Sequence, residues 1–429
     1  MIIKNYQQLG TSEIRKQALN ILEAGLESIN TEALMDKQFF YDEKKDSLLI
    51  MDQKYSLKNV HRVVVVGAGK MAARAARMIE KKMGQRIDGG VVIDIVPADL
   101  KIIASRVGTH PLPSSANVAA TDEIIQMLNN LTERDLVISI IGGGGSSLLT
   151  NPKTVSLEEE RKITSALMDA GSDIREMNTV RKHLSQIKGG GLAVLAYPAT
   201  VISLIFSDVP GDDISQVASG PTVLDKTTMQ DAMEIMNKYR ILDRCSMNSC
   251  GLTESSKDEK YFEKVNNILF CSSKTALKAM ENKARDLGLR TKIWHTAYGG
   301  EAREIAKEIT TTIEKGQCLI AAGESVVTIA KGSPKGSGGR NQEMALSALL
   351  TIPEDTVFSA VNSDGRDNSD VAGGMVDSGN LALAKRNGLD VADAVARHDE
   401  YGLILDLNAA VMTGVTGSNI SDLIVCIRH

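Results

Sequence analysis

Three carboxylates directly follow an apolar run near the middle of the chain. The run VISLIF (201–206) predicts a strand buried on both faces, and the next residues, SDVPGDD, place Asp208, Asp212 and Asp213 at its carboxyl end. In open α/β sheets, ligands bind at that end of the strands. Carboxylates this close together repel one another unless a cation or a proton donor compensates. The segment therefore predicts a catalytic or ligand-binding site.

Two glycine-rich turns also follow predicted strands, one at 67–70 (GAGK) and one at 142–147 (GGGGSS). Such turns bring backbone N–H groups and the start of a helix close to an anion. Lys70 lies inside the first turn and would point at that anion. We therefore expect the two turns to contact the phosphates of a nucleotide. The expected contacts are Gly67, Gly69, Gly143, Gly144, Gly145, Ser146 and Ser147.

The first turn leaves two other interpretations open. Continued to Ala72, it fits the GxGxxA pattern of dinucleotide-binding folds. That pattern expects an acid at the end of the second strand, whereas Asp94 falls inside the predicted strand 91–96. The glycines could also serve only to tighten the turn. A phosphate loop of the form GxxxxGK[ST] occurs nowhere in the sequence.

Further polar side chains are candidates for the same chemistry. Arg181 and Lys188 share one face of a predicted helix, and that face is either a ligand-binding or an ordinary solvated surface. In KGSGGRNQ (335–342), glycines hold Arg340 and Asn341 in a tight turn. Arginine suits bidentate contact with a carboxylate or phosphate, whereas the asparagine could instead hold a helix N-terminus.

The organisation of the chain predicts two α/β domains. Strand signals at 62–67, 91–96, 135–141 and 201–206 alternate with helical stretches at 69–83, 117–131 and 157–170. This alternation is typical of a doubly wound parallel sheet. A polar stretch at 242–263 marks a boundary, after which 317–323 and 325–332 are expected to form a hairpin in a mixed sheet. We therefore predict an N-terminal domain over 1–245 and a C-terminal domain over 260–429.

Composition excludes several classes of protein. Hydrophobic residues make up 43% and charged residues 24% of the 429 residues, which is typical of a globular protein. A net charge of −5 and an aromatic content of 3% argue against a nucleic-acid partner. Apolar runs are too short for a membrane span, and the five cysteines form no CxxC pair. We expect a cytoplasmic protein without nucleic-acid or membrane partners.

Phosphate-type turns, basic side chains and an acidic strand end together fit phosphoryl transfer, in which Lys, Arg and Mg²⁺ position and neutralise charge. From the residues alone, the chain is either a kinase without a P-loop or another anion-binding α/β enzyme. A nicotinamide-dependent oxidoreductase acting on a small hydroxy acid is one alternative. A non-enzymatic sensor of sugar phosphates or nucleotides is another.

Long motifs over nearly the whole chain resemble those of glycerate 2-kinases of the type II group, whose C-terminal part is the MOFRL domain. They are GAGK (67–70), GGGGSSLL (142–149), NTVRKHLSQIKGGGLA (178–193), SDVPGDDISQVASGPT (207–222), GGRNQE (338–343) and SDGRDNSDVAGGMVD (363–377). The resemblance implies ATP- and Mg²⁺-dependent phosphorylation of the 2-hydroxyl of D-glycerate to 2-phosphoglycerate. It also implies a Rossmann-like N-terminal domain, a mixed-sheet MOFRL-type C-terminal domain and an active site in the cleft between them.

The resemblance also assigns roles to individual residues. It implies catalytic roles for Lys70, Asp208 and Arg340, with Asp208 orienting or deprotonating the hydroxyl of glycerate. Lys70 and Arg340 would hold the substrate carboxylate or the transferring phosphoryl group. We further expect Lys188 and Asn341 among the nucleotide contacts. The candidate metal ligands are Asp212, Asp213 and Asp364. The sequence leaves monomer and homodimer open.

Overall fold

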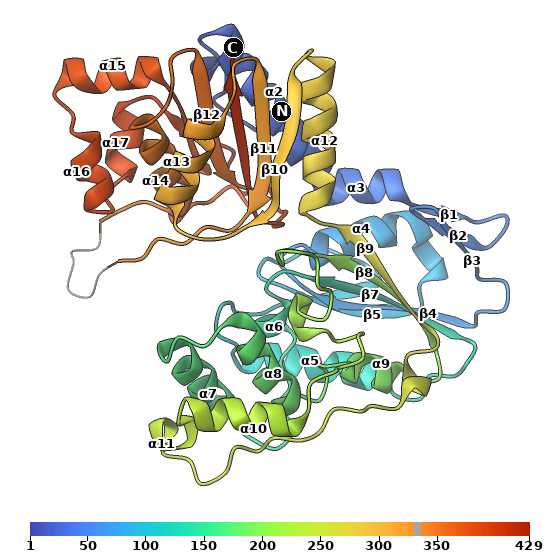
Figure 1. Cartoon of the computed structure of the whole chain (residues 1–429). Helices are drawn as coiled ribbons and strands as arrows, with labels where there is room; N and C mark the ends of the chain where they lie inside the picture. The colour runs from blue at the N-terminus through green and yellow to red at the C-terminus, as the bar shows by residue number, and fades with distance from the viewer. Residues whose placement is uncertain (330–335) are drawn as a thin grey trace. The chain divides into compact units, whose positions relative to one another are not determined.

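The computed structural model describes residues 1–329 and 336–429, which form two compact units (Figure 1). The Rossmann-like unit comprises Leu34–Phe270. The mixed-sheet unit comprises Met1–Ala33 together with Cys271–His429. Each unit is built around a six-stranded sheet covered by helices. The α/β class and the pairing of a doubly wound sheet with a mixed sheet are confirmed.

The Rossmann-like unit is organised by a sheet in the order β6-β5-β4-β7-β8-β9. Its strands are β4 (Arg62–Ala68), β5 (Gly89–Asp94), β6 (Ile103–Val107), β7 (Asp135–Gly142), β8 (Thr200–Phe206) and β9 (Val265–Cys271). β4 pairs in parallel with both β5 and β7, and β7 pairs in parallel with β8. This is the doubly wound order, in which the chain reverses direction across the sheet between β4 and β7. All residues of β7 are buried, as expected for a central strand covered on both faces.

Helices cover both faces of this sheet (Figure 1). Val64 and Val66 of β4 join α5 (Ser115–Leu128) and α9 (Gly191–Ala196) in one apolar cluster, while α4 (Ala72–Met83) packs against β5 and β7. A second cluster joins α7 (Leu157–Asp169), α8 (Ile174–Leu184), α10 (Met229–Lys238) and α11 (Ile241–Cys245). Smaller elements are α6 (Gly145–Leu148) and an antiparallel sheet of β1 (Phe39–Asp42), β2 (Ser47–Ile50) and β3 (Gln53–Ser56).

The mixed-sheet unit has the strand order β10-β11-β15-β12-β13-β14. The strands are β10 (Arg290–Tyr298), β11 (Gln317–Gly323), β12 (Thr356–Asn362), β13 (Gly373–Asp377), β14 (Ala410–Val411) and β15 (Asp422–Arg428). β10 and β11 are parallel, and the other pairs are antiparallel. On one face lie α13 (Ala302–Thr312), α14 (Arg340–Leu349), α15 (Ser378–Asn387), α16 (Val391–Ala396) and α17 (Tyr401–Asp406) (Figure 1).

The N-terminal helices belong to the mixed-sheet unit, which corrects the expected assignment of residues 1–245 to one domain. After the short α1 (Tyr6–Leu9), α2 (Glu13–Ser28) packs against α12 (Ser273–Asp286) and β15. The contact is close, because a β-carbon at Gly25 would lie 2.8 Å from Met280 Cγ. Arg15 of α2 is buried and donates to Asp377 at 2.7 Å. The border between the units lies within α3 (Thr31–Gln38).

Two further expectations are corrected by strand pairing. The expected C-terminal domain over 260–429 includes β9, which instead lies beside β8 in the Rossmann-like sheet. The predicted hairpin of 317–323 with 325–332 is wrong, because β11 pairs with β10 and β15 instead. Residues 330–332 of that hairpin lie outside the described residues. Among the helices that the structure describes, none combines the length and apolar character needed to cross a membrane.

Replacing Gly67 by alanine should destabilise the protein by about 1–3 kcal/mol, the usual cost of overpacking. A β-carbon there would overlap the carbonyl oxygen of Ile140 on β7, and backbone cannot rotate away. At the control position Gly89, a β-carbon meets only Met127 Cε at 3.7 Å, so Gly89→Ala should be nearly neutral. Urea unfolding of both variants checks the prediction. Equal stabilities would contradict the close approach of β4 to β7.

Candidate active site

Three loops of the Rossmann-like unit leave the sheet side by side. Ala68 of β4 pairs with Ile141 of β7, and Gly142 pairs with Phe206 of β8, so the three strands end at the same level. The loops that follow carry the GAGK turn, the GGGGSS turn and Asp208. The backbone N–H of Lys70 donates to the carbonyl oxygen of Gly143 at 3.0 Å, which fixes the first loop against the second.

The glycine loop after β7 lies between an acidic and a basic group. A β-carbon at Gly143 would overlap the carboxylate of Asp208, so this carboxylate lies directly against the loop. Gly144 has a positive φ of 79°, which favours glycine. A β-carbon there would lie 3.2 Å from both Lys70 Cγ and His110 Cδ2. The missing side chains therefore let Asp208, Lys70 and His110 approach the same short stretch of backbone.

Lys70, His110 and Arg181 form a basic cluster in this unit. Partial burial, followed by the charges of Lys70 and Arg181, lowers the pKa of His110 to about 4. His110 is exposed, so solvent partly screens the two charges, and the imidazole with its lowered pKa is neutral near neutral pH. Burial also lowers the pKa of Arg181, which the charge of Glu160 opposes.

No hydrogen bond or ion pair within the described parts of the chain engages the Lys70 ammonium or the Arg181 guanidinium. Both cations act electrostatically on the neutral imidazole, and the charge of Glu160 also acts on Arg181 without an ion pair between them. Such a cluster attracts an anionic ligand, and its arginine can form paired hydrogen bonds to a carboxylate or phosphate. The sequence singled out Lys70 and noted Arg181. It did not indicate that they meet at His110.

The two serines of the glycine loop make internal contacts. Ser147 is buried, and its hydroxyl donates to the carbonyl oxygen of Pro111 at 2.5 Å. Ser146 Oγ lies 3.0 Å from Ser219 Oγ, and Ser219 donates to Asn178 at 2.9 Å. Both serines therefore anchor the loop. Their expected contacts with phosphates stay a prediction.

Lys188 is not on a solvated helix face. Its side chain is fully enclosed, and its ammonium lies 3.3 Å from the buried carboxylate of Glu160. Burial lowers the pKa of Lys188, which the charge of Glu160 opposes. A nucleotide contact by Lys188 would require this ion pair to open, so the structure assigns the lysine an internal role.

The candidate metal ligands have other local roles. Asp213 accepts from the backbone N–H and the hydroxyl of Ser215 at 3.0 and 2.7 Å, which is a local turn. Asp212 lies in the same loop with a φ of 60°. Asp364 belongs to the mixed-sheet unit and accepts from the N–H of Arg366 at 2.8 Å. Their binding of metal stays a prediction.

Arg340 begins α14 in the mixed-sheet unit and is held by two carboxylates. Its Nε and Nη2 donate to Asp422 at 2.6 and 2.9 Å, and its Nη1 lies 2.8 Å from Glu324. Burial lowers the pKa of Arg340, but its hydrogen bonds to Asp422 and the negative charges of Asp422, Glu324 and Asp367 together raise it. Burial raises the pKa of Asp422 to about 6, against the effect of Arg340. The guanidinium is therefore fixed in orientation before any ligand binds.

The amide of Asn341 supports the start of the same helix. Asp367 accepts from the backbone N–H groups of Asn341 and Gln342 at 3.0 and 2.9 Å. The side-chain Nδ2 of Asn341 donates to the same carboxylate at 3.2 Å. Asn341 is fully buried. The geometry agrees with the second interpretation from the sequence, in which the amide holds a helix N-terminus. A contact with nucleotide stays a prediction.

Asp94 weakens the dinucleotide interpretation. It ends β5, where a dinucleotide site needs an accessible acid for the ribose. Here the side chain is 0% exposed and accepts from the backbone N–H of Ala73 at 3.0 Å and of Ile95 at 2.6 Å. The carboxylate therefore supports the first turn of α4, and no ribose can reach it without local rearrangement.

Two family models match this chain. Residues 17–250 match a family described as a domain of unknown function, DUF4147, and residues 317–422 match the MOFRL family. A D-glycerate 2-kinase of Thermotoga maritima is 35% identical over 86% of this chain and 91% of its own length. The chain belongs to the glycerate 2-kinase family.

Two further proteins that are similar to this chain are informative. A crystal structure named as glycerate kinase from Thermotoga maritima superposes with a TM-score of 0.82 and 31% identity, covering 96% of this chain and 99% of that one. A protein of Agrobacterium vitis, provisionally named a hydroxypyruvate reductase, is 36% identical over 84% of this chain and 86% of its own length. The second name matches the oxidoreductase alternative, against which the burial of Asp94 argues.

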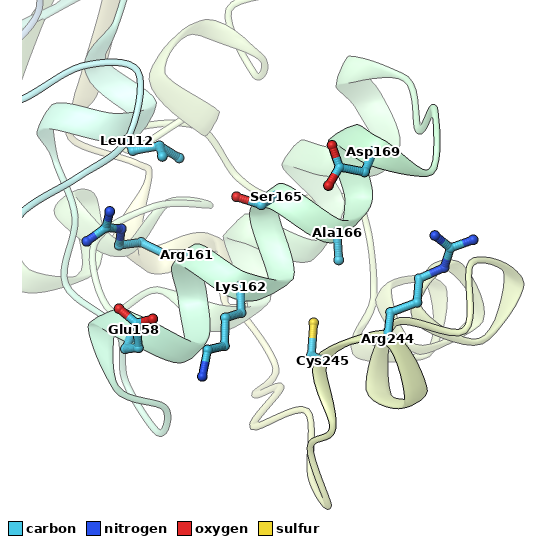
Figure 2. Close-up of a pocket in the computed structure, with 9 residues that line it drawn as sticks. All are labelled: Leu112, Glu158, Arg161, Lys162, Ser165, Ala166, Asp169, Arg244 and Cys245. Atoms are coloured by element: carbon cyan, nitrogen blue, oxygen red, sulfur yellow. The ribbon is translucent and has the colours of Figure 1, made fainter. Parts of the chain in front are cut away.

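One cavity of this protein lies away from the site residues that the sequence predicts (Figure 2). About 640 Å³ in volume, it is bounded by α7 and by the end of α11, where Cys245 and Arg244 lie. Its charged groups are of both signs: Glu158, Arg161 and Lys162 lie near the start of α7 and Asp169 at its end (Figure 2). None of the site residues expected from the sequence lines it. Size alone therefore does not locate the site in this fold.

Stability should depend on pH through Asp94. Burial raises the pKa of Asp94 to about 6, above its ordinary value of 3.8. The folded state therefore disfavours the carboxylate, and stability is lost as pH rises from about 4 to about 6, by roughly 2–4 kcal/mol in total. The Asp94→Asn variant cannot ionise there, so its stability relative to the wild type should rise over that interval.

The measurement is urea unfolding of both proteins across that pH interval, with Asp99→Asn, an exposed acid nearby, as control. A lost hydrogen bond to Ala73 or Ile95 would shift the variant by a constant amount at every pH, so only the slope is informative. Parallel pH profiles for wild type and Asp94→Asn would contradict the burial of an ionisable carboxyl at this position.

Proposed function

We propose that this protein is a glycerate 2-kinase, which transfers the γ-phosphoryl group of ATP to the 2-hydroxyl of D-glycerate. The single observation that carries the proposal is the glycine loop at 143–144, with Asp208 against one glycine and Lys70 and His110 around the next. An anionic substrate with a free hydroxyl needs this combination of cations and a carboxylate. Family membership supports the proposal, since the relatives described above are named for glycerate phosphorylation.

In the proposed reaction, the carboxylate of Asp208 orients the 2-hydroxyl and accepts its proton. The hydroxyl oxygen forms a bond to the γ-phosphorus of ATP, and the bond from that phosphorus to the β–γ bridging oxygen breaks, which releases ADP and 2-phosphoglycerate. Mg²⁺ arrives with ATP as part of the substrate. Lys70 and Arg181 contact the two anionic substrates. Their positive charges reduce the electrostatic repulsion between these substrates.

We also propose that Arg340, a residue of the mixed-sheet unit, contributes to the same reaction. Its orientation is fixed by Asp422, and one guanidinium nitrogen faces Glu324, which is about half exposed. An arginine held in this way can neutralise a phosphoryl group without losing further conformational entropy. The expectation of a cytoplasmic enzyme also belongs to this proposal, and the five free thiols suit a reducing compartment.

The test of the proposal is an incubation of the purified protein with ATP, Mg²⁺ and D-glycerate, followed by identification of the product by ³¹P and ¹H NMR. We expect 2-phosphoglycerate. Formation of 3-phosphoglycerate would contradict the proposed position of transfer. Oxidation of NADH or NADPH with hydroxypyruvate, without any requirement for ATP, would favour the oxidoreductase alternative. Ligand binding without turnover would favour the sensor.

Replacing Asp208 by asparagine should lower kcat by roughly 10²–10⁴-fold, the usual contribution of a positioned proton acceptor. Binding of D-glycerate should change little, because the amide keeps the shape of the side chain and the cations remain. Asp169→Asn, an exposed acid of the same unit, is the control. Steady-state kinetics and calorimetric glycerate binding give the two readouts. Retained turnover would assign proton transfer to another group.

Replacing Arg181 by methionine should raise the KM of one anionic substrate by roughly 10–100-fold, the cost of losing a charged hydrogen-bond donor. Separate KM measurements for D-glycerate and for ATP show which anion the cluster holds. Arg175→Met alters an exposed arginine on the same helix and is the matched control. Unchanged KM values for both substrates in Arg181→Met would remove the cluster from substrate binding.

A further inference from the structure

A second group of titratable side chains lies in the mixed-sheet unit. Glu343 is on the first turn of α14, while His398 and Glu400 lie between α16 and α17. One carboxylate oxygen of each glutamate and one ring nitrogen of the histidine all lie within 4.8 Å of one another. The three side chains line a cavity of about 440 Å³, which Arg340 also lines. Nothing in the sequence indicated that these residues meet.

The two carboxyl groups of this cluster are buried. Glu343 is 1% exposed and Glu400 is 2% exposed. Oε1 of Glu400 is enclosed, and the described residues supply no hydrogen-bond partner to it. A buried carboxylate oxygen without a partner is costly, and a second carboxylate beside it raises that cost. Either a bound cation or a proton shared between the two carboxyl groups must relieve this repulsion.

Among the described residues, one arginine forms an ion pair with one of the two carboxylates of the cluster. Arg303 donates to Glu343 Oε1 at 2.7 Å and to the carbonyl oxygen of Val395 at 2.8 Å, so it compensates for one carboxylate. His398 Nδ1 lies 2.8 Å from the other oxygen of Glu343 and 2.9 Å from Arg303 Nη2. Arg340 is engaged by Asp422 and Glu324. Among residues 1–329 and 336–429, no basic side chain forms an ion pair with Glu400, on which Arg303 acts only through its charge.

We propose that Glu343, His398 and Glu400 bind a divalent first-row metal ion, of the Mn²⁺ or Zn²⁺ type. Mixed carboxylate oxygen and imidazole nitrogen donors suit these ions better than Mg²⁺, which prefers oxygen donors and retains several waters. The ligand spacing fits one ion bound by a single atom from each residue. The proposal does not depend on the kinase reaction, because this ion is distinct from the Mg²⁺ that accompanies ATP.

Such an ion would stabilise the start of α14. A β-carbon at Gly338 would lie 2.5 Å from Glu400 Oε2, so the turn that precedes Arg340 lies directly against this ligand. Glu343 is on the helix that Arg340 begins. A metal bound to Glu343 and Glu400 would therefore join this turn, the helix and the segment at 398–400, and would restrict the position of Arg340.

The experiment measures metal binding to the full-length protein after treatment with EDTA and removal of the chelator. Calorimetry with MnCl₂ and with ZnCl₂, together with metal analysis of the purified protein, should give one ion per chain and a raised melting temperature. Glu400→Gln and His398→Gln should each weaken binding by about tenfold or more, because each removes a ligand. Asp406→Asn, an exposed acid at the other end of α17, should bind as the wild type does.

Two results would overturn the proposal. One is the absence of saturable binding of either ion up to millimolar concentration, which would assign the cluster to a shared proton. The other is wild-type affinity in both ligand variants with circular dichroism spectra unchanged, which would place the ion elsewhere. His398→Gln keeps the test decisive if Glu400→Gln does not fold.

Discussion

The candidate site depends on how closely the ends of β4 and β7 approach each other. These strands are central in the sheet, and the chain reverses direction between them. Gly67 lies against the carbonyl of Ile140, and the N–H of Lys70 bonds to Gly143. A larger residue at 67 would separate the two strand ends, and one at 143 would displace the carboxylate of Asp208. Separation would move Lys70 away from Asp208, so the electrostatics of the site rest on steric fit between backbones.

The mixed-sheet unit positions its arginine differently. There, a helix N-terminus is held by one buried acid, Asp367, while a second buried acid, Asp422, fixes the first side chain of that helix. Both acids lose hydration on folding, which raises the pKa of each. Hydrogen bonds from Arg340, Asn341 and Gln342 recover part of that cost. The unit thus exchanges stability for a guanidinium with a single orientation.

Much of the Rossmann-like sheet could be predicted because its central strands are apolar runs that end in glycine or acidic turns. Lys70 and Asp208 were found for the same reason, since each directly follows such a run. The partners of these residues could not be found in this way. His110 lies beside Lys70 at Gly144, and Arg340 is bonded to Asp422, although each pair is distant in sequence. Burial of Lys188 and Asp94 was also missed, because helical or strand periodicity does not report what packs against a face.

The expectation that α2 belongs to the N-terminal domain was wrong for a related reason. The actual packing of α2 has a consequence for biosynthesis. Apolar residues on one side of α2 show that this helix needs a covering surface, but not which surface covers it. That surface includes β15, which is translated about 400 residues after α2. At about 5–20 residues per second, the apolar side of α2 is not completely covered until roughly 20–80 s after its own synthesis. The whole Rossmann-like unit, Leu34–Phe270, is translated before the remainder of the mixed-sheet unit. The apolar side of α2 must therefore be shielded from other contacts while synthesis continues.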